Sequence, residues 1–325
     1  MTNRYNHFFL VGFFFLMYIS VHSQNDPLFT QYMQNRLIIN PAYAGSNLGL
    51  DVAAVARFQN IGLSNRLTTT QSVALSSSVD VLKGGVGLAL TNDMIGLQRT
   101  TALQVNYAFQ KRINSVNIGV GAGVGFINLG LNGSAIITPN GEYGSSINHN
   151  DPNLPQTFVN SFSPDFSVGV YIGNKKFFVS ASVNHLYTNQ KVSGLSQYFS
   201  YNHDRNLIIS GGYNFEITKK FYLQPSLLVR TNFQKVQFDL STLLNVYNNF
   251  LVGAAFRGYS SRSIDAISFF AGASFKNFKI IYSYDVGISF IRKFNSGSHE
   301  ISLNYSIPLK INQLEGKYYY NSRYL

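Results

Sequence analysis

The chain has 325 residues, of which 45% are hydrophobic, 15% aromatic and only 12% charged, with a formal net charge of +11. Globular proteins carry about 25% charged residues, so this composition disfavours an ordinary soluble domain, and a mean hydropathy near zero disfavours a bundle of membrane helices. The basic residues do not gather in a run, so nucleic-acid binding is not expected, and the absence of cysteine excludes disulfides, thiolate metal sites and N-terminal lipoprotein attachment.

The N-terminus has the pattern of an export signal. An apolar stretch at 8–19 follows a short polar region, and Val21 and Ser23 supply small residues before a cleavage site. The stretch is too short to span a bilayer comfortably, because a spanning helix needs about 20 residues. We therefore expect residues 1–23 to be a signal peptide that is cleaved near Ser23, leaving Gln24 first.

The next segment, residues 24–48, is aromatic and interrupted by proline, and it is too polar to span a membrane. Its simplest interpretation is a periplasmic lead-in with a turn at Asn40-Pro41. The alternative is a plug inside the domain that follows.

From residue 49 to residue 308 apolar and polar residues alternate with a period of two. In 101–110, 118–126 and 301–307 one face of each segment is apolar and the other is polar or glycine. We predict an all-β, antiparallel transmembrane outer-membrane barrel of about fourteen strands, because most segments have the length that a tilted strand needs to cross a bilayer. The expected strands are 49–58, 68–80, 84–92, 98–110, 115–127, 164–173, 176–185, 206–217, 220–230, 235–246, 250–258, 264–275, 278–288 and 299–308.

Short and long connections alternate along the chain, as periplasmic turns and extracellular loops do in outer-membrane barrels. The longest connections are 128–163 and 186–205, and both are expected at the cell exterior. This parity places both termini in the periplasm, including the C-terminal tail 309–325. The short turns form a basic periplasmic rim without acidic residues: Lys83, Lys111, Arg112, Lys175, Lys176, Lys219, Lys220 and Lys276. A soluble β-sandwich would not explain this asymmetry of the connections.

Several charged residues fall in or beside the predicted strands. A charge that faces lipid at mid-depth costs about 2–4 kcal/mol, so these residues should point into the lumen or lie at a rim. There they could pair and hold a plug, or line a pore. They are Arg57, Asp165, Arg230, Asp239, Arg257, Asp265 and Asp285.

No catalytic, cofactor-binding or metal-binding set is predicted. His185 closes a strand, and His203 beside Asp204 lies in a loop without a nucleophile motif. The oxygen-bearing residues at 148–153 lack the glycine and the final glutamate of a calcium loop. We therefore expect no enzyme and no cofactor.

Nine short motifs are similar in sequence and in order to one known family. They are DPLFTQYMQN from Asp26, NPAYAG from Asn40, PDFSVGVY from Pro164, SVNHL from Ser182, PSLL from Pro225 with QFDL from Gln237, DAIS from Asp265 with YSYD from Tyr282, and GSHEI from Gly297. Together they cover nearly all of the mature chain. The chain thus resembles the PorP/SprF family of type IX secretion system membrane proteins.

The resemblance implies an outer-membrane protein of Bacteroidetes-type bacteria that assists the secretion or surface anchoring of particular cargo, such as gliding adhesins. It implies as partners outer-membrane lipid, type IX cargo and periplasmic components of the system. Segment 26–45 would then plug the barrel or bind partners, through Asp26, Pro27, Phe29, Gln31, Tyr32, Asn40, Pro41, Tyr43 and Gly45. The alternative function is a passive channel or small-solute transporter, which requires an open lumen.

Overall fold

The structure is a computed structural model that describes residues 26–308 except 63–67, 137–154, 156, 188–189, 192–199, 202–203, 260–263 and 289. The expected signal peptide and the C-terminal tail 309–325 lie outside the described residues. In the described part no helix is both long and apolar enough to cross a membrane.

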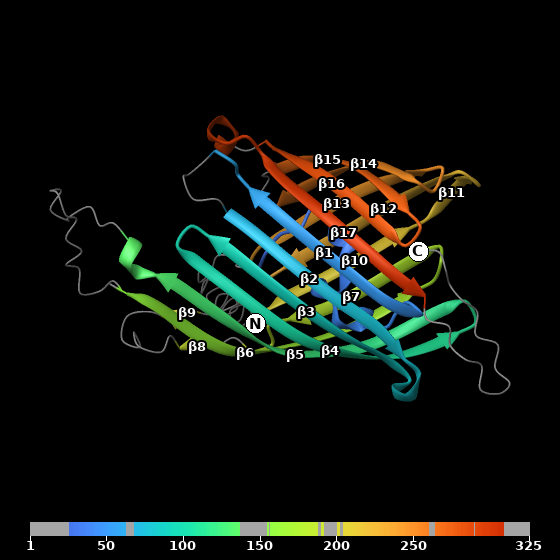
Figure 1. Ribbon diagram of the computed structural model, residues 1–325, viewed down its shortest axis with the longest axis horizontal. Helices are drawn as coiled ribbons and strands as arrows, with labels where there is room; N and C mark the ends of the chain where they lie inside the picture. Colours follow the sequence, from blue (N-terminus) through green and yellow to red (C-terminus); the bar gives the residue numbers. More distant parts are fainter. Residues whose placement is uncertain are drawn as a thin grey trace, which may run out of the picture.

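The chain forms one large antiparallel sheet that closes on itself (Figure 1). Its strands are β1 (Gly49–Gln59), β2 (Thr68–Val79), β3 (Gly84–Ile95), β4 (Gln98–Ile113), β5 (Val116–Asn132), β6 (Phe158–Gly173), β7 (Phe177–Asn184), β10 (Asn206–Tyr213), β11 (Phe215–Thr218), β12 (Phe221–Thr231), β13 (Val236–Val246), β14 (Phe250–Tyr259), β15 (Ile264–Phe275), β16 (Phe278–Gly287) and β17 (Ser298–Pro308). A separate two-stranded hairpin is formed by β8 (Gln190–Lys191) and β9 (Ser200–Tyr201).

Two features of the pairing make the sheet a barrel of fourteen wall strands. β1 pairs with β17, so the first and last strands meet at a seam. β10 and β11 both pair with β12 and are separated by Asn214 alone, so they act as one interrupted strand of the wall. The predicted fold class and strand number are therefore confirmed.

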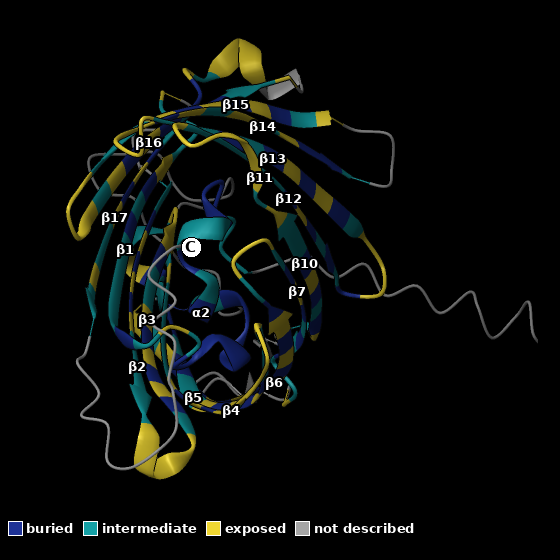
Figure 2. Ribbon diagram, turned by 90° about the vertical axis from the view of Figure 1, so that its right-hand side faces the viewer, coloured by how far each residue is buried: buried dark blue, intermediate teal, exposed yellow. Residues whose placement is uncertain are grey.

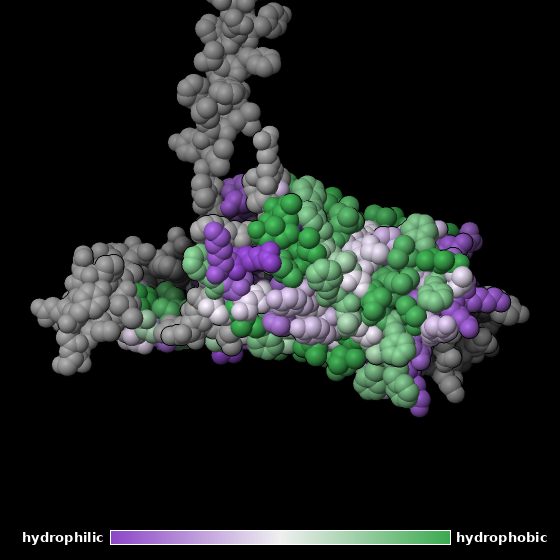
Figure 3. Space-filling view, turned by 90° about the horizontal axis from the view of Figure 1, so that it is seen from above, coloured by the Kyte–Doolittle hydropathy of each residue, from purple (hydrophilic) through white to green (hydrophobic). Residues whose placement is uncertain are grey.

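Side chains alternate between lipid and lumen along each strand, because successive residues of a strand point to opposite faces. In β6 Phe162 is 64% exposed, whereas its neighbours Ser161 and Ser163 are each 1% exposed. On the face shown in Figure 3, hydrophobic residues cover the middle of the wall and hydrophilic residues lie toward both ends. This is the surface of a protein whose solvent is a bilayer.

Six short connections lie at one end of the barrel, because antiparallel strands return to the same end at every second connection. The two-residue β3–β4 connection, 96–97, lies at the other end. The end with the six short connections, the short-turn rim, also holds Gly49, where β1 begins, and Pro308, where β17 ends. All of the basic residues expected in the short turns are exposed there: Lys83, Lys111, Arg112, Lys175, Lys176, Lys219, Lys220 and Lys276. One acidic residue joins them, since β2 ends at Val79 and Asp80 opens the turn η3 (Asp80–Leu82).

The expected loop 128–163 is shorter than predicted. β5 and β6 continue to pair as far as Asn132 and Phe158, beyond the bilayer-length strands that the alternation indicated. Phe162 lies on Phe126 outside the wall, with ring centroids 4.9 Å apart, while small polar residues face inward. Alternation thus persists into a segment whose Asn, Ser and Pro content resembled a loop.

Candidate functional site

The lumen contains the segment that precedes β1. It folds into three short helices, η1 (Tyr32–Gln34), α2 (Arg36–Ile39) and η2 (Pro41–Tyr43), inside the ring of strands. Figure 2 looks into the short-turn end and shows these buried turns surrounded by the wall. We call residues 26–45 the plug segment.

The plug segment crosses the barrel from one end to the other. Asp26 lies beside His185 and Asn206, at the ends of β7 and β10 that are far from the short turns. Gly45 packs on Gly85 at the start of β3, at the short-turn rim. Asp26, the first described residue, is therefore at the opposite end from Pro308, the last one. The expectation that both termini lie on the same side concerns residues outside the described part. It counted the strands alone, and the plug segment adds one more crossing.

The strongest attachment of the plug segment is the carboxylate of Glu300 in β17. Its two oxygens accept the backbone N–H groups of Thr30, at 2.9 Å, and Gln31, at 2.7 Å. The same carboxylate forms a 2.9 Å ion pair with Arg57, which is its pairing partner across the β1–β17 seam. All of these groups are buried, so the carboxylate satisfies two amides and one cation that have no access to water.

Arg57 and Arg257 link this attachment to further lumen carboxylates. Arg57 pairs with Asp285 at 2.7 Å, and Arg257 pairs with Asp239 at 2.6 Å. The hydroxyl of Thr30 lies between them: it donates to Asp285 at 2.7 Å and accepts hydrogen bonds from both arginines, at 2.7 and 3.3 Å. One plug side chain thus joins two ion pairs from neighbouring parts of the wall, and Arg257 also lies 4.0 Å from Asp285.

Gln31 and Tyr32 extend the polar contacts. The Gln31 amide donates to the Ser283 hydroxyl at 3.0 Å and accepts from Ser302, and the Tyr32 hydroxyl lies 2.9 Å from that of Ser226. The Tyr32 phenol is buried and serves as a hydrogen-bonding group.

Nearer the short turns, hydrogen bonds from side-chain amides to backbone carbonyls hold the plug segment. The Asn40 side chain donates to Val170 O at 3.0 Å and caps η2 by accepting from Ala42 N at 2.8 Å. The Gln110 amide donates to the carbonyls of Ala42 and Ala44. This close approach explains Gly119 and Gly121 on the inner face of β5, since a Cβ on Gly121 would lie 2.6 Å from the Ala42 backbone.

The other predicted plug residues have simpler surroundings. Phe29 and Pro41 are buried, and Tyr43 packs on Tyr171 with ring centroids 4.6 Å apart. The carbonyl of Pro27 accepts a 3.3 Å hydrogen bond from the buried Arg230.

At the far end His185 clamps the start of the plug segment between two carboxylates. Its Nε2 lies 2.8 Å from Asp26, and its Nδ1 lies 3.0 Å from Asp165 in β6. Burial lowers the pKa of His185, but Asp26 and Asp165 outweigh it and raise the pKa to about 10. The imidazolium therefore persists at neutral pH and joins plug to wall.

Six of the seven predicted lumen charges thus lie buried inside, namely Arg57, Asp165, Arg230, Asp239, Arg257 and Asp285. Asp265 is only half-buried near the far end of β15, and it joins none of the ion pairs in the described part of the chain. Sequence reasoning missed Glu300 and His185 as lumen residues. A signal existed for Glu300: its neighbours in 301–307 alternate, and extending that register places Glu300 on the polar face with Ser302.

No group of three acidic, histidine or cysteine residues in the described part could hold a metal ion. The buried residues serve to attach the plug segment: hydrogen-bond donors and acceptors pair with one another and hold this segment against the inner face of the barrel wall. The plug segment occupies much of the lumen of the barrel.

A family model described as "Type IX secretion system membrane protein PorP/SprF" matches residues 21–305. The chain belongs to the PorP/SprF family. The resemblance drawn from the sequence motifs is thereby confirmed, and the barrel is an outer-membrane component of that secretion system. No curated protein matches the chain.

Solved outer-membrane proteins share the general shape of this PorP/SprF protein. The Pseudomonas putida toluene transporter TodX has a TM-score of 0.48 at 10% identity, over 85% of this chain and 94% of that one. Omp33 of Acinetobacter baumannii gives 0.44 at 9%, over 81% and 100%, and the monoaromatic hydrocarbon channel CymD gives 0.45 at 12%, over 88% and 95%. At such values nothing of their activity is transferred to this chain.

Replacing Arg57 by Met should loosen the plug segment. The change leaves Glu300 and Asp285 without their shared cation, and breaking a buried pair costs about 3–5 kcal/mol. We expect a lower unfolding free energy in urea and faster hydrogen exchange at the amides of Thr30 and Gln31. Arg99→Met, at an exposed arginine, should stay within about 0.5 kcal/mol. Equal effects of the two substitutions would contradict the attachment.

The His185 clamp should make stability depend on pH. The folded pKa of about 10 exceeds the ordinary value of about 6.5, so its contribution is full below pH 6.5 and is lost as pH rises through 10. His185→Asn suits the backbone, since φ is +57° and Asn tolerates that region. We expect the difference in unfolding free energy between native protein and variant to be large at pH 6 and small at pH 10.5. A difference that is constant with pH would contradict this.

Proposed function

We propose that this PorP/SprF protein is an accessory barrel of type IX secretion, needed for secretion or surface anchoring of a specific cargo such as a gliding adhesin. The observation that carries the proposal is the plug segment. Because residues 26–45 cross the lumen and are held there by buried hydrogen bonds and ion pairs, the barrel suits protein contact better than passage of solutes.

The proposal includes an orientation. The short-turn rim, with its exposed lysines, faces the periplasm and meets acidic surfaces of secretion components there. The far end, where Asp26 meets His185, faces the cell exterior, and the chain is exported by a signal peptide that is cleaved near Ser23. The C-terminal tail 309–325 is then periplasmic, on the side where β17 ends.

The long connections at the outer end are the proposed cargo contacts. Much of 128–163 and 186–205 lies outside the described residues, so the support comes from position: β5 and β6 carry their connection beyond the neighbouring strands (Figure 1). The start of the plug segment, where Asp26 meets His185, lies at the same end.

Deleting the gene should remove one particular type IX cargo from the cell surface while other cargo is still secreted. Surface proteomics and immunolabelling of intact cells would measure this, and the native gene supplied in trans should restore the missing protein. Full secretion and attachment of all type IX cargo in the deletion strain would refute the accessory role.

The passive channel is the competing function, and it makes a different prediction. The full-length protein in planar bilayers should show no steady ion conductance, because the plug segment occupies the lumen, whereas a porin prepared in the same way should conduct. Steady conductance at porin levels from the full-length chain would favour the channel.

A further inference from the structure

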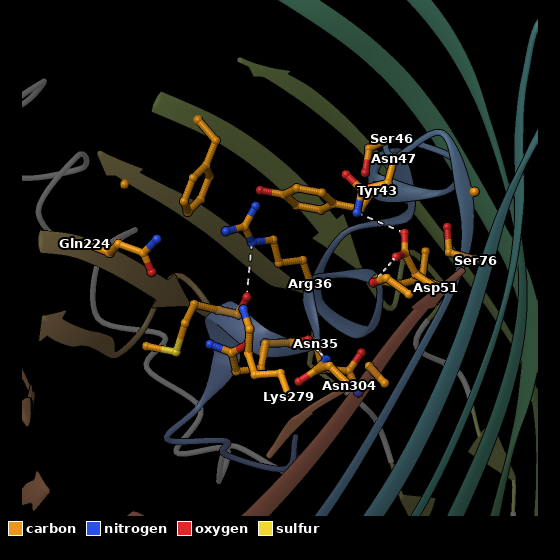
Figure 4. Close-up of a pocket in the computed structure, with 18 of the residues that line it drawn as sticks. Asn35, Arg36, Tyr43, Ser46, Asn47, Asp51, Ser76, Gln224, Lys279 and Asn304 are labelled. Atoms are coloured by element: carbon orange, nitrogen blue, oxygen red, sulfur yellow. Dashed lines mark hydrogen bonds between the residues drawn. The ribbon is translucent and has the colours of Figure 1, made fainter. Parts of the chain in front are cut away.

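A cavity of about 610 Å³ lies between the plug segment and the wall at the short-turn rim (Figure 4). It is bounded by plug residues around Arg36 and by strands on the opposite side, and residues of the rim itself, such as Lys176 and Pro308, line its mouth. Its size is within the range of about 300–1,000 Å³ that is common for ligand sites. The plug therefore leaves one end of the lumen hollow.

The cavity contains two cations for which no ion pair exists in the described part of the chain. Arg36 uses only Nε internally, donating to Met33 O at 3.2 Å, and its guanidinium lies over the ring of Phe178, 4.1 Å from the centroid. Lys279 of β16 extends into the same space in Figure 4. Stacking fixes the guanidinium while its terminal N–H groups stay available for an anion.

A third side chain in the cavity is buried without any partner. Asn35 is 4% exposed, and neither its amide nitrogen nor its amide oxygen forms a hydrogen bond. Buried polar groups are nearly always paired, so an amide of this kind beside two cations indicates a group that arrives from outside the chain. This observation is independent of the charges.

The acidic residue in the cavity does not neutralise these cations. Asp51 accepts hydrogen bonds from Asn47 at 2.9 Å and from the Ser306 hydroxyl at 2.6 Å, and it forms no ion pair in the described residues. At the mouth Lys176 and Lys276 add positive charge. An incoming anion is therefore attracted along the whole path.

Apolar surface beside the cations decides which kind of anion fits. Met33 and Leu48 line the same cavity and keep part of their surface exposed, so a free phosphate would leave these side chains wet. A peptide can place carboxylates on the cations and apolar side chains on this surface. A planar carboxylate also matches the fork of an arginine.

We propose that this cavity binds an acidic peptide segment of another protein, with Arg36, Lys279 and Asn35 as its receptors. This proposal adds a partner to the proposed function. It rests on the proposed function in one respect only, namely that the peptide enters from the periplasm. Binding to purified protein does not depend on cargo secretion, so the two proposals can fail separately.

The test uses the full-length protein in detergent and a fluorescein-labelled peptide, Glu-Phe-Glu-Gly-Phe-Glu, with fluorescence anisotropy as the readout. We expect saturable one-to-one binding that weakens with salt, and no binding of the peptide in which Gln replaces Glu. Lys279→Met and Arg36→Met should each weaken binding about tenfold or more, since each removes a hydrogen bond to a charged group.

Lys219→Met is the matched control, because Lys219 lies on the same rim outside the cavity, and it should change binding less than twofold. Lys279→Gln is a second variant, and the heat-dependent gel shift of folded barrels verifies that each variant folds. Equal binding of the Gln peptide, an equal loss with Lys219→Met, or complete displacement by millimolar inorganic phosphate would each overturn the proposal.

Discussion

The rest of the structure depends on one buried carboxylate. Glu300 accepts two backbone amides of the plug segment and pairs with Arg57 across the seam. Without these partners a buried carboxylate would be costly, and without the carboxylate two buried amides would be unsatisfied. Wall and plug therefore stabilise each other through a group that neither could hold alone. The same reciprocity recurs where Thr30 joins the pairs of Arg57 and Arg257.

This dependence separates the two faces of the wall. Outside, residues such as Phe162 and Val120 need only be apolar, because lipid makes no directional demands. Inside, the residue type is set by contacts with the plug segment: Gly121 leaves room for the Ala42 backbone, and Ser302 and Asp285 form hydrogen bonds with plug side chains. A barrel whose lumen served solutes would not need this specificity along its length. The inner face of the wall is therefore matched to the plug segment at particular residues.

Much of the barrel could be predicted from sequence, because period-two alternation directly records which face of a strand meets lipid. Strand positions near 84, 206 and 278 followed from that pattern and from the turns. The path of the plug segment could not be predicted, since Thr30 and Gln31 carry no local signal for contact with Glu300, which is 270 residues away from Thr30. The length of the β5–β6 pair could not be predicted either, because both strands extend through residues whose composition resembled that of a loop. Alternation thus predicts which face of a strand meets lipid, but it predicts neither where a strand ends nor which distant residues come into contact.

The crossing of the lumen by the plug segment constrains how the protein can assemble. Its downstream end is covalently joined to β1 at the short-turn rim, and its upstream end lies at the opposite mouth. A closed wall would have to be threaded end-first, whereas a wall still open between β1 and β17 lets the segment lie against the inner face directly. Arg57 and Glu300 face each other where β1 meets β17. Glu300 also accepts hydrogen bonds from the backbone amides of Thr30 and Gln31. The contacts that close the wall and the contacts that hold the N-terminal segment therefore share one ion pair, so neither set can be lost without weakening the other.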